Sequence, residues 1–299
     1  MSRSTKVGRR SEQVRRARER RRRVDRRLRR AWWAIAAGPA LVVLLVLVKL
    51  AIPEGTVAPV AAGPLPDDVA AALQVDPSTL DAVGRGSGVT PPTPITGQPP
   101  LTAGDKPLVI YFGADYCPFC AAQRWALVIA LNRFGSFTGL RTAFSSSEDV
   151  FPSTATMSFH GSTYESDFLA FEGVELAGSE KVNGRYPTLD TPTPAQQAVL
   201  STYDAPPYVP AQSAGAVPFI DFGNLALMSG ASFSPGLLKG MTQQQIADAI
   251  RDDPDGTVGQ AILGAANAFT AAICRVTGNQ PASVCSTAAA TAYQQEVGG

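Results

Sequence analysis

The chain has 299 residues, 45% hydrophobic and 17% charged, which is long and apolar enough to bury one good-sized core with appendages. Its formal charge of +1 hides a strong asymmetry, because residues 1–30 carry a net charge of +12 and the remainder carries −11. The near-neutral average therefore describes neither part, and it excludes a uniformly basic or uniformly acidic protein.

The first 30 residues form a basic tail that holds 15 of the 26 Lys and Arg residues. We interpret this tail as a topology determinant that rests on anionic lipid on the cytoplasmic side. Two alternatives are nucleic-acid binding and docking of a cytoplasmic partner. We expect no nucleic-acid partner, because the run contains no interleaved aromatic residue and a membrane segment follows it.

Residues 31–52 form an apolar stretch long enough to cross a bilayer as one helix. Trp32 and Trp33 suit one membrane interface, and Lys49 can reach the other. Because the basic flank stays inside, we predict an uncleaved signal anchor in the cell membrane, with a cytoplasmic N-terminus and an extracytoplasmic C-terminal domain. A signal peptide cleaved after the small residues 60–62 is the alternative.

Residues 53–104 are rich in Pro, Gly and Ala, and we interpret them as a linker that holds the domain off the membrane. Two short segments, residues 66–73 and 77–83, break this pattern with helix-forming residues that follow acids or a proline. We expect these short helices to dock on the domain of residues 105–299.

A pair of cysteines follows the apolar run at residues 107–112 and precedes a helical pattern at residues 121–134. The spacing of Cys117 and Cys120 lets both sulfurs approach on one helical turn, where the helix N-terminus stabilises a thiolate. Cys117 is therefore predicted as the nucleophile and Cys120 as the resolving thiol. Pro118 fits the first turn, where its missing N–H has no intrahelical partner. Half of a zinc site is the alternative, but a strand before the pair and a helix after it favour a redox centre.

The later residues alternate between strand and helix patterns. A strand at residues 140–144 is predicted to complete a βαβ unit, with Gly135 ending the helix before it. Further strands are expected within residues 154–176 and at 217–222. Helices are expected at 194–203, 242–251 and 258–276. The fold class is therefore α/β, with one N-terminal transmembrane helix and a C-terminal helical extension.

These motifs resemble the thioredoxin superfamily: the strand, the GADYCPFC turn, the long helix and the later segment Ala216-Val217-Pro218-Phe219-Ile220. The resemblance implies a thioredoxin-like fold, with a central mixed sheet flanked by helices. It also implies that Pro218 is a cis-proline facing the redox pair and that the backbone of Val217 contacts a substrate polypeptide. Several separated motifs across roughly residues 65–286, including YCPFCAAQRWALVIALNRFG and NAFTAAICRVTGNQPASVC, also resemble a prokaryotic membrane-anchored family known as domain of unknown function 929. That resemblance implies a fold and no substrate.

The residues around the pair depart from the commonest thioredoxin pattern. Tyr116 stands where that pattern has Trp, and Pro118-Phe119 is more similar to the dipeptide of glutaredoxins or periplasmic oxidases. These supporting residues influence the pKa of the thiolate and the reduction potential of the cysteine pair. Because they differ from the common pattern, the sequence leaves open whether the protein oxidises or reduces its clients. Asp115 is a candidate proton relay, or an acid beside a helix N-terminus with no catalytic part.

Cys274 and Cys285 form a second pair in a segment expected to be extracytoplasmic, where oxidation persists. We predict a structural disulfide that links the last long helix covalently to the C-terminal segment. A shuttle of electrons to Cys117 and Cys120, or a zinc site made by all four cysteines, are the alternatives.

The remaining motifs restrict the chemistry. His160 is the only histidine, which excludes a conventional Cys-His hydrolase unless it lies beside Cys117. The acidic serine-rich run at residues 145–149 follows a predicted strand, where loops often line a site. Five aromatic residues are predicted to be core residues rather than a peptide groove: Phe151, Phe159, Tyr164, Phe168 and Phe171.

Three functions fit these observations. The favoured one is a membrane-anchored thiol–disulfide oxidoreductase that acts on thiols or disulfides of exported polypeptides, uses no cofactor or metal, and is regenerated by a membrane redox partner. The second is a non-catalytic thioredoxin-like binding subunit of an envelope complex. The third is a metal-binding or metallochaperone module that uses the Cys-Pro-Phe-Cys motif.

Overall fold

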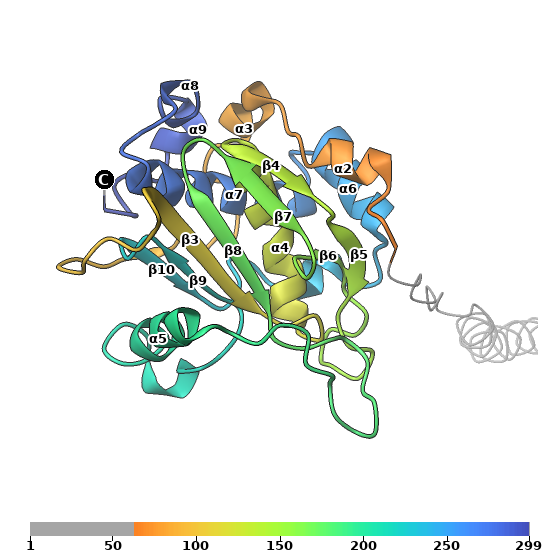
Figure 1. Cartoon of the computed structure of the whole chain (residues 1–299). Coiled ribbons are helices and arrows are strands. Elements are labelled where there is room, and N and C mark those ends of the chain that lie inside the picture. Colours follow the sequence, from red (N-terminus) through yellow and green to blue (C-terminus); the bar gives the residue numbers. More distant parts are fainter. Residues whose placement is uncertain (1–62, 299) are drawn as a thin grey trace, which may run out of the picture. The chain divides into compact units, whose positions relative to one another are not determined.

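A computed structural model describes residues 63–298 (Figure 1). The predicted basic tail, the predicted membrane span and the first part of the predicted linker lie outside these residues. The fold is a mixed α/β arrangement in which helices flank a central mixed sheet. This confirms the expected α/β class with a central mixed sheet flanked by helices.

The central sheet is built around β3 (Lys106–Gly113). On one side β3 pairs antiparallel with β9 (Phe219–Phe222), which pairs with β10 (Ala226–Ser229) and then β1 (Thr93–Pro94). On the other side β3 pairs parallel with β8 (Ala170–Glu175) and, at its start, antiparallel with β2 (Thr102–Ala103).

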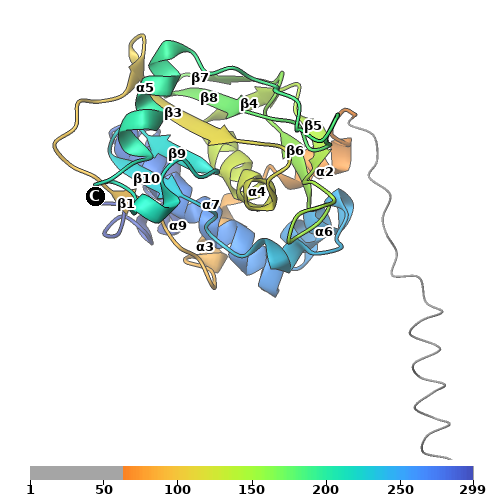
Figure 2. The same ribbon diagram turned by 90° about the horizontal axis from the view of Figure 1, so that it is seen from below.

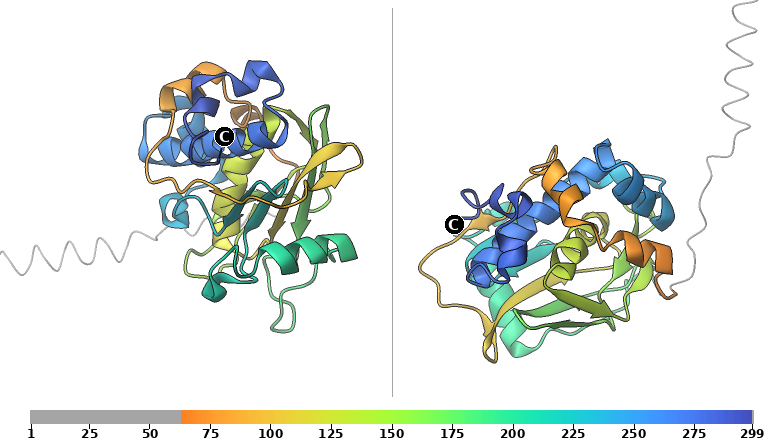
Figure 3. Two further views of the ribbon diagram at one scale, coloured as in Figure 1. Left: turned by 90° about the vertical axis from the view of Figure 1, so that its left-hand side faces the viewer. Right: turned by 90° about the horizontal axis from the view of Figure 1, so that it is seen from above.

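The side chains of β3 alternate between two hydrophobic layers, because successive residues of a strand point to opposite faces. Val109 and Tyr111 pack with the helices α4 (Pro118–Asn132) and α7 (Thr257–Val276). Leu108, Ile110 and Phe112 pack with α5 (Pro194–Tyr203) in the second layer. Figures 2 and 3 show α4 between the sheet and the C-terminal helices. A strand buried on both faces explains why residues 107–112 read as a continuous apolar run.

Helix α7 is the one described helix that is long and apolar enough to cross a membrane, and most of it is buried in the core. Its small residues allow close packing against the segment before β1. A Cβ atom added at Gly264 would lie 2.6 Å from the carbonyl oxygen of Arg85, and one at Gly86 would lie 2.1 Å from that of Gln260. Neither position tolerates a side chain without movement of the backbone.

Shorter elements complete the described residues. Helices α2 (Asp67–Ala72) and α3 (Pro77–Val83) place Val69 and Leu80 in the same core as α4 and α7. Two further ribbons pair β4 (Gly135–Thr138) with β7 (Thr163–Ser166) and β5 (Arg141–Phe144) with β6 (Ala155–Ser158). The remaining helices are α6 (Gln243–Asp252), α8 (Ala282–Cys285) and α9 (Ala288–Thr291), with 3₁₀ turns at Ala211–Ser213 and Pro235–Leu238.

Two details of the predicted βαβ unit were wrong. The parallel neighbour of β3 is β8, whereas the strand at residues 141–144 pairs antiparallel with β6 in a separate ribbon. Gly135 does not cap the helix, which ends at Asn132 with Arg133 as its C-cap, but begins β4. A glycine is needed there because a Cβ atom would lie 2.1 Å from the carbonyl oxygen of Glu165 on the paired strand.

Candidate redox site

The cysteine pair lies where β3 gives way to α4, as the sequence predicts. Cys117 is the N-cap residue of α4, and its Sγ accepts a hydrogen bond from the backbone N–H of Cys120 at 3.3 Å. Pro118 occupies the first turn. Both cysteines are free thiols, and Cys117 is only 6% exposed whereas Cys120 is fully buried.

The two thiols differ in acidity. The hydrogen bond from the Cys120 side chain lowers the pKa of Cys117, and the Cys120 backbone N–H and the charge of Arg124 act in the same direction against the effect of burial. Burial raises the pKa of Cys120 well above its usual value, and the neighbouring Cys117 adds to this shift. Cys117 is therefore the more acidic of the two thiols, and its thiolate is the nucleophilic form.

The loop before β9 forms the opposite wall of the site. The Val217–Pro218 peptide bond is cis. The carbonyl oxygen of Val217 accepts a hydrogen bond from the Cys117 thiol at 3.5 Å. Within residues 63–298, the N–H of Val217 donates to no other residue. Residues 100 positions apart in the sequence thus meet at the reactive sulfur.

A third wall is made by two segments that we call the collar, residues 145–154 and 177–190. Tyr116 stacks on Tyr186 with ring centroids 4.4 Å apart, and the Tyr186 hydroxyl donates to Ser146 Oγ at 2.8 Å. The Ser146 N–H in turn donates to the Tyr116 carbonyl oxygen at 2.9 Å. An ion pair between Lys181 and Glu148, 2.5 Å long, also joins the two segments.

The side of the pair that faces the core holds a buried ion cluster. Arg124 lies one helical turn after Cys120, and its guanidinium donates to both carboxylate oxygens of Glu175 at 2.7 and 2.6 Å. It also donates to Asp115 at 3.2 Å. Burial alone lowers the pKa of an arginine, but these carboxylates raise that of Arg124 well above its usual value. Arg124 therefore carries a fixed positive charge beneath the thiols.

Neither Arg124 nor Glu175 was identified from the sequence as a site residue, although the position of Arg124 in an apolar helix was a signal for a buried ion pair. A charged residue in a helix that is otherwise apolar all round needs a buried partner. Asp115, a candidate proton relay from the sequence, is paired with Arg124 in the structure. Ser146, from the serine-rich run, does lie beside the pair through Tyr116.

The other predicted residues lie elsewhere or make different contacts. Cys274 and Cys285 are joined in a disulfide, away from the thiols at the C-terminal end of α7. His160 contacts Asp190 through Nδ1 at 2.6 Å. Of the five aromatic residues, four join the core cluster, whereas Phe151 is half-buried and contacts Phe119 with ring centroids 5.9 Å apart.

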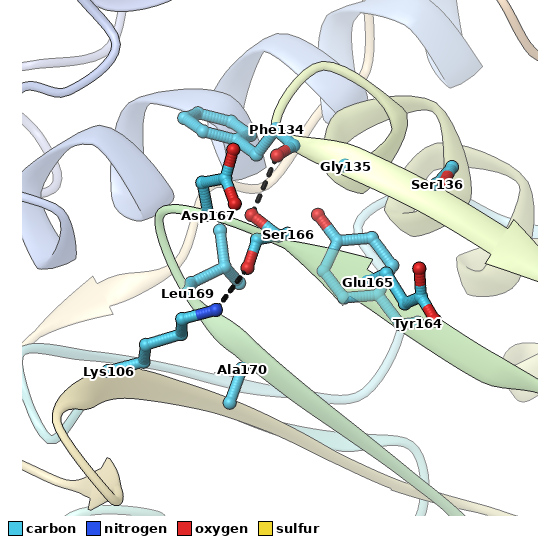
Figure 4. Close-up of a pocket in the computed structure, with 10 residues that line it drawn as sticks. All are labelled: Lys106, Phe134, Gly135, Ser136, Tyr164, Glu165, Ser166, Asp167, Leu169 and Ala170. Carbon is cyan, nitrogen blue, oxygen red and sulfur yellow. Dashed lines mark hydrogen bonds between the residues drawn. The ribbon is translucent and has the colours of Figure 1, made fainter.

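A cavity of about 610 Å³ lies at the other end of β3 (Figure 4). It is lined by Lys106, whose Nζ donates to the Ser166 carbonyl oxygen at 2.5 Å, and by polar residues of β4 and β7. Lys106 begins β3 and the thiols follow its last residue, so this cavity is separate from the cysteine pair. In the part of the chain that the structure describes, no three His, Cys, Asp or Glu side chains are grouped to hold a metal ion.

A family model described as Domain of unknown function (DUF929) matches residues 96–275, which is more than half of the chain. The chain belongs to this family. The match includes the cysteine pair, the Val217–Pro218 loop, both collar segments and all of the central sheet except β1. No curated protein matches the chain. No solved structure matches it either.

Proposed function

We propose that this DUF929 protein is a thiol–disulfide oxidoreductase whose nucleophile is Cys117. The observation that carries the proposal is the position of the Cys117 sulfur, between the N-terminus of α4 and the cis Val217–Pro218 loop. A helix N-terminus and a fixed Arg124 charge stabilise a thiolate, and an adjacent thiol completes a two-cysteine exchange. The arrangement of strand, cysteine pair, helix and cis-proline supports a thioredoxin-like fold.

The reaction transfers two electrons. The Cys117 thiolate attacks one sulfur of a client disulfide, a mixed disulfide forms, and the other client sulfur leaves as a thiolate. Cys120 then loses its proton and attacks Cys117 Sγ, which releases the second client sulfur. The client gains two electrons, and the protein now holds a Cys117–Cys120 disulfide. The same steps in reverse oxidise a client dithiol.

We place this chemistry outside the cytoplasm. Residues 31–52 are proposed as a signal anchor with the basic tail on the cytoplasmic face, so the clients are exported polypeptides. A membrane dithiol or disulfide partner then regenerates the pair. A reporter fused after residue 299 should be extracytoplasmic, and the protein should stay with the membrane. Release of a mature chain that begins near Gly63 would contradict the anchor.

The chemistry is tested by trapping. In cells, Cys120→Ser should accumulate covalent client adducts that disappear on reduction, because the mixed disulfide at Cys117 then lacks its resolving thiol. Cys117→Ser is the matched control and should accumulate none. If Cys120→Ser gives no adduct and a dithiol assay shows no turnover, the chain is better explained as a binding subunit. Stoichiometric metal in the purified protein would instead favour the metal-binding module.

A further inference from the structure

Large exposed hydrophobic side chains lie on the cysteine motif and on the two collar segments beside it. Among residues 63–298, the large hydrophobic residues that are exposed are Phe119 at 40%, Val150 at 70% and Val182 at 60%. Phe119 lies between the two cysteines, Val150 lies in the first collar segment and Val182 in the second. Exposed apolar side chains concentrated at one site indicate a binding surface rather than chance.

The collar holds these side chains in place. Its two segments follow β5 and β8, and Figure 1 shows the chain after both strands running below the end of α4 where the cysteines lie. The Tyr186–Ser146 hydrogen bond, the Lys181–Glu148 ion pair and the Tyr116–Tyr186 stack tie the segments to each other and to Cys117's neighbour. Phe151 then supports Phe119. Phe119, Val150 and Phe151 therefore form an apolar rim, the name we use for these three residues below.

Access to Cys117 restricts what can sit on this rim. Its side chain is enclosed by the cis-proline loop, the start of α4 and Tyr116, which leaves 6% exposed. A folded surface cannot bring a disulfide to so enclosed a sulfur without rearrangement. An extended segment can, and the free N–H of Val217 is available to pair with its backbone.

We propose that the apolar rim selects extended polypeptide segments in which a large apolar side chain lies close to the reacting cysteine. This inference rests on the proposed function and specifies its clients. The segment pairs with the Val217 backbone, its cysteine meets Cys117, and its apolar neighbour covers Phe119, Phe151 and Val150. Burial of one such side chain accounts for about a tenfold preference over a polar one.

The test uses the full-length reduced protein and two peptide disulfides in a single-turnover assay. Each disulfide joins two copies of one peptide through its single cysteine, so attack at either sulfur gives the same products. The two peptides differ only in Leu or Ser two residues after the cysteine. Two free peptides and one Cys117–Cys120 disulfide form per event, which balances the electrons. The Leu peptide should react about tenfold faster.

Variants then locate the preference. Val150→Asp should reduce the ratio of the Leu rate to the Ser rate severalfold, because a carboxylate replaces the exposed apolar contact. Phe151→Ala, which removes the ring supporting Phe119, should also reduce it. Ser136→Asp adds the same charge on β4 and should leave the ratio unchanged.

The possible failures are distinct. Equal rates for the two peptides, with turnover of both, would overturn the apolar rim and leave the oxidoreductase standing. A Leu preference that survives Val150→Asp and Phe151→Ala would also overturn it, because the selectivity would then lie elsewhere. No reaction with either peptide, together with no client trapping, would overturn both proposals.

Discussion

The two cysteine pairs of this protein lie at opposite ends of helices. Cys117 caps the N-terminus of α4, whereas Cys274 lies in the last turn of α7 and Cys285 ends α8. Unpaired N–H groups and the positive dipole end stabilise a thiolate at the first site, and the carbonyl end of a helix disfavours one at the second. The same residue type is therefore a pair of free thiols at one site and a disulfide cross-link at the other, which fits the exchange proposed for the first.

The arginines beside the two pairs show the same difference. Arg124 contacts two carboxylates and acts on the thiols through its charge. Arg275, next to Cys274, donates to the backbone carbonyl oxygens of Leu225 and Val297 at 2.7 and 2.6 Å. The charge of Arg124 lowers the pKa of Cys117, whereas Arg275 joins the C-terminal segment to the turn after β9.

The largest effect is expected from Arg124→Met. This change leaves Glu175 buried without its partner, which costs about 3–5 kcal/mol of unfolding free energy. It also raises the pKa of Cys117, because the positive charge that lowers it is removed. Denaturant unfolding and the pH profile of Cys117 alkylation measure the two effects.

Two controls separate charge from packing. Arg124→Met combined with Glu175→Met should recover part of the lost stability but not the Cys117 pKa. Arg275→Met should leave the Cys117 pKa unchanged. If both arginine variants shift that pKa equally, the comparison between the two sites is wrong.

A buried acid in the central sheet makes the stability of the fold depend on pH. Asp221 lies on β9, three residues after Pro218, and burial raises its pKa to about 7 against the hydrogen bond from the Asn224 N–H. The folded state therefore keeps a proton that the unfolded state releases near pH 4, so stability is fully present below about pH 4 and falls as pH rises to about 7.

Asp221→Asn should remove the part of the slope that Asp221 contributes, about 4 kcal/mol across that pH range. The part contributed by Asp204, whose pKa burial also raises to about 7, should remain. Unfolding free energies measured at pH 4.5, 5.5 and 7 in parent and variant test it. A slope equal to that of the parent protein would show that Asp221 does not contribute to it.

The smallest effect is expected at the second pair. Cys274→Ser opens a cross-link over 11 residues and should lower the unfolding free energy by about 2–3 kcal/mol. It should leave the thiol reactivity of Cys117 unchanged. Mild dithiothreitol should reduce an oxidised Cys117–Cys120 pair before Cys274–Cys285, and equal reducibility of both pairs would instead support an electron shuttle.

Local patterns in the sequence predicted the cysteine turn and several helices of the fold. The strand before Cys117, the helix after it and the helices of residues 194–203, 242–251 and 258–276 follow from apolar periodicity and end signals within one element. Capping boxes at Thr193 and Thr242 explain why the N-termini of two of these helices could be predicted.

Contacts between distant residues were not predictable in the same way. Arg124 and Glu175 are 51 residues apart, and Tyr186 and Ser146 are 40 apart, so each pair depends on which strands become neighbours. The sequence assigned the wrong parallel neighbour to β3, and β8, which carries Glu175, is the strand that this error missed. Because the predicted strand order was wrong, the contact between Arg124 and Glu175 could not be predicted.

The central claim is that Cys117 carries a stabilised thiolate while Cys120 is held as a thiol. The most direct measurement is alkylation of the reduced full-length protein across a pH series, with each modified cysteine located by peptide mapping. We expect modification at Cys117, with a midpoint below the usual thiol pKa of about 8.5, and little at Cys120 until the protein unfolds. Preferential modification at Cys120, or a Cys117 midpoint at or above that of a free thiol, would contradict the account.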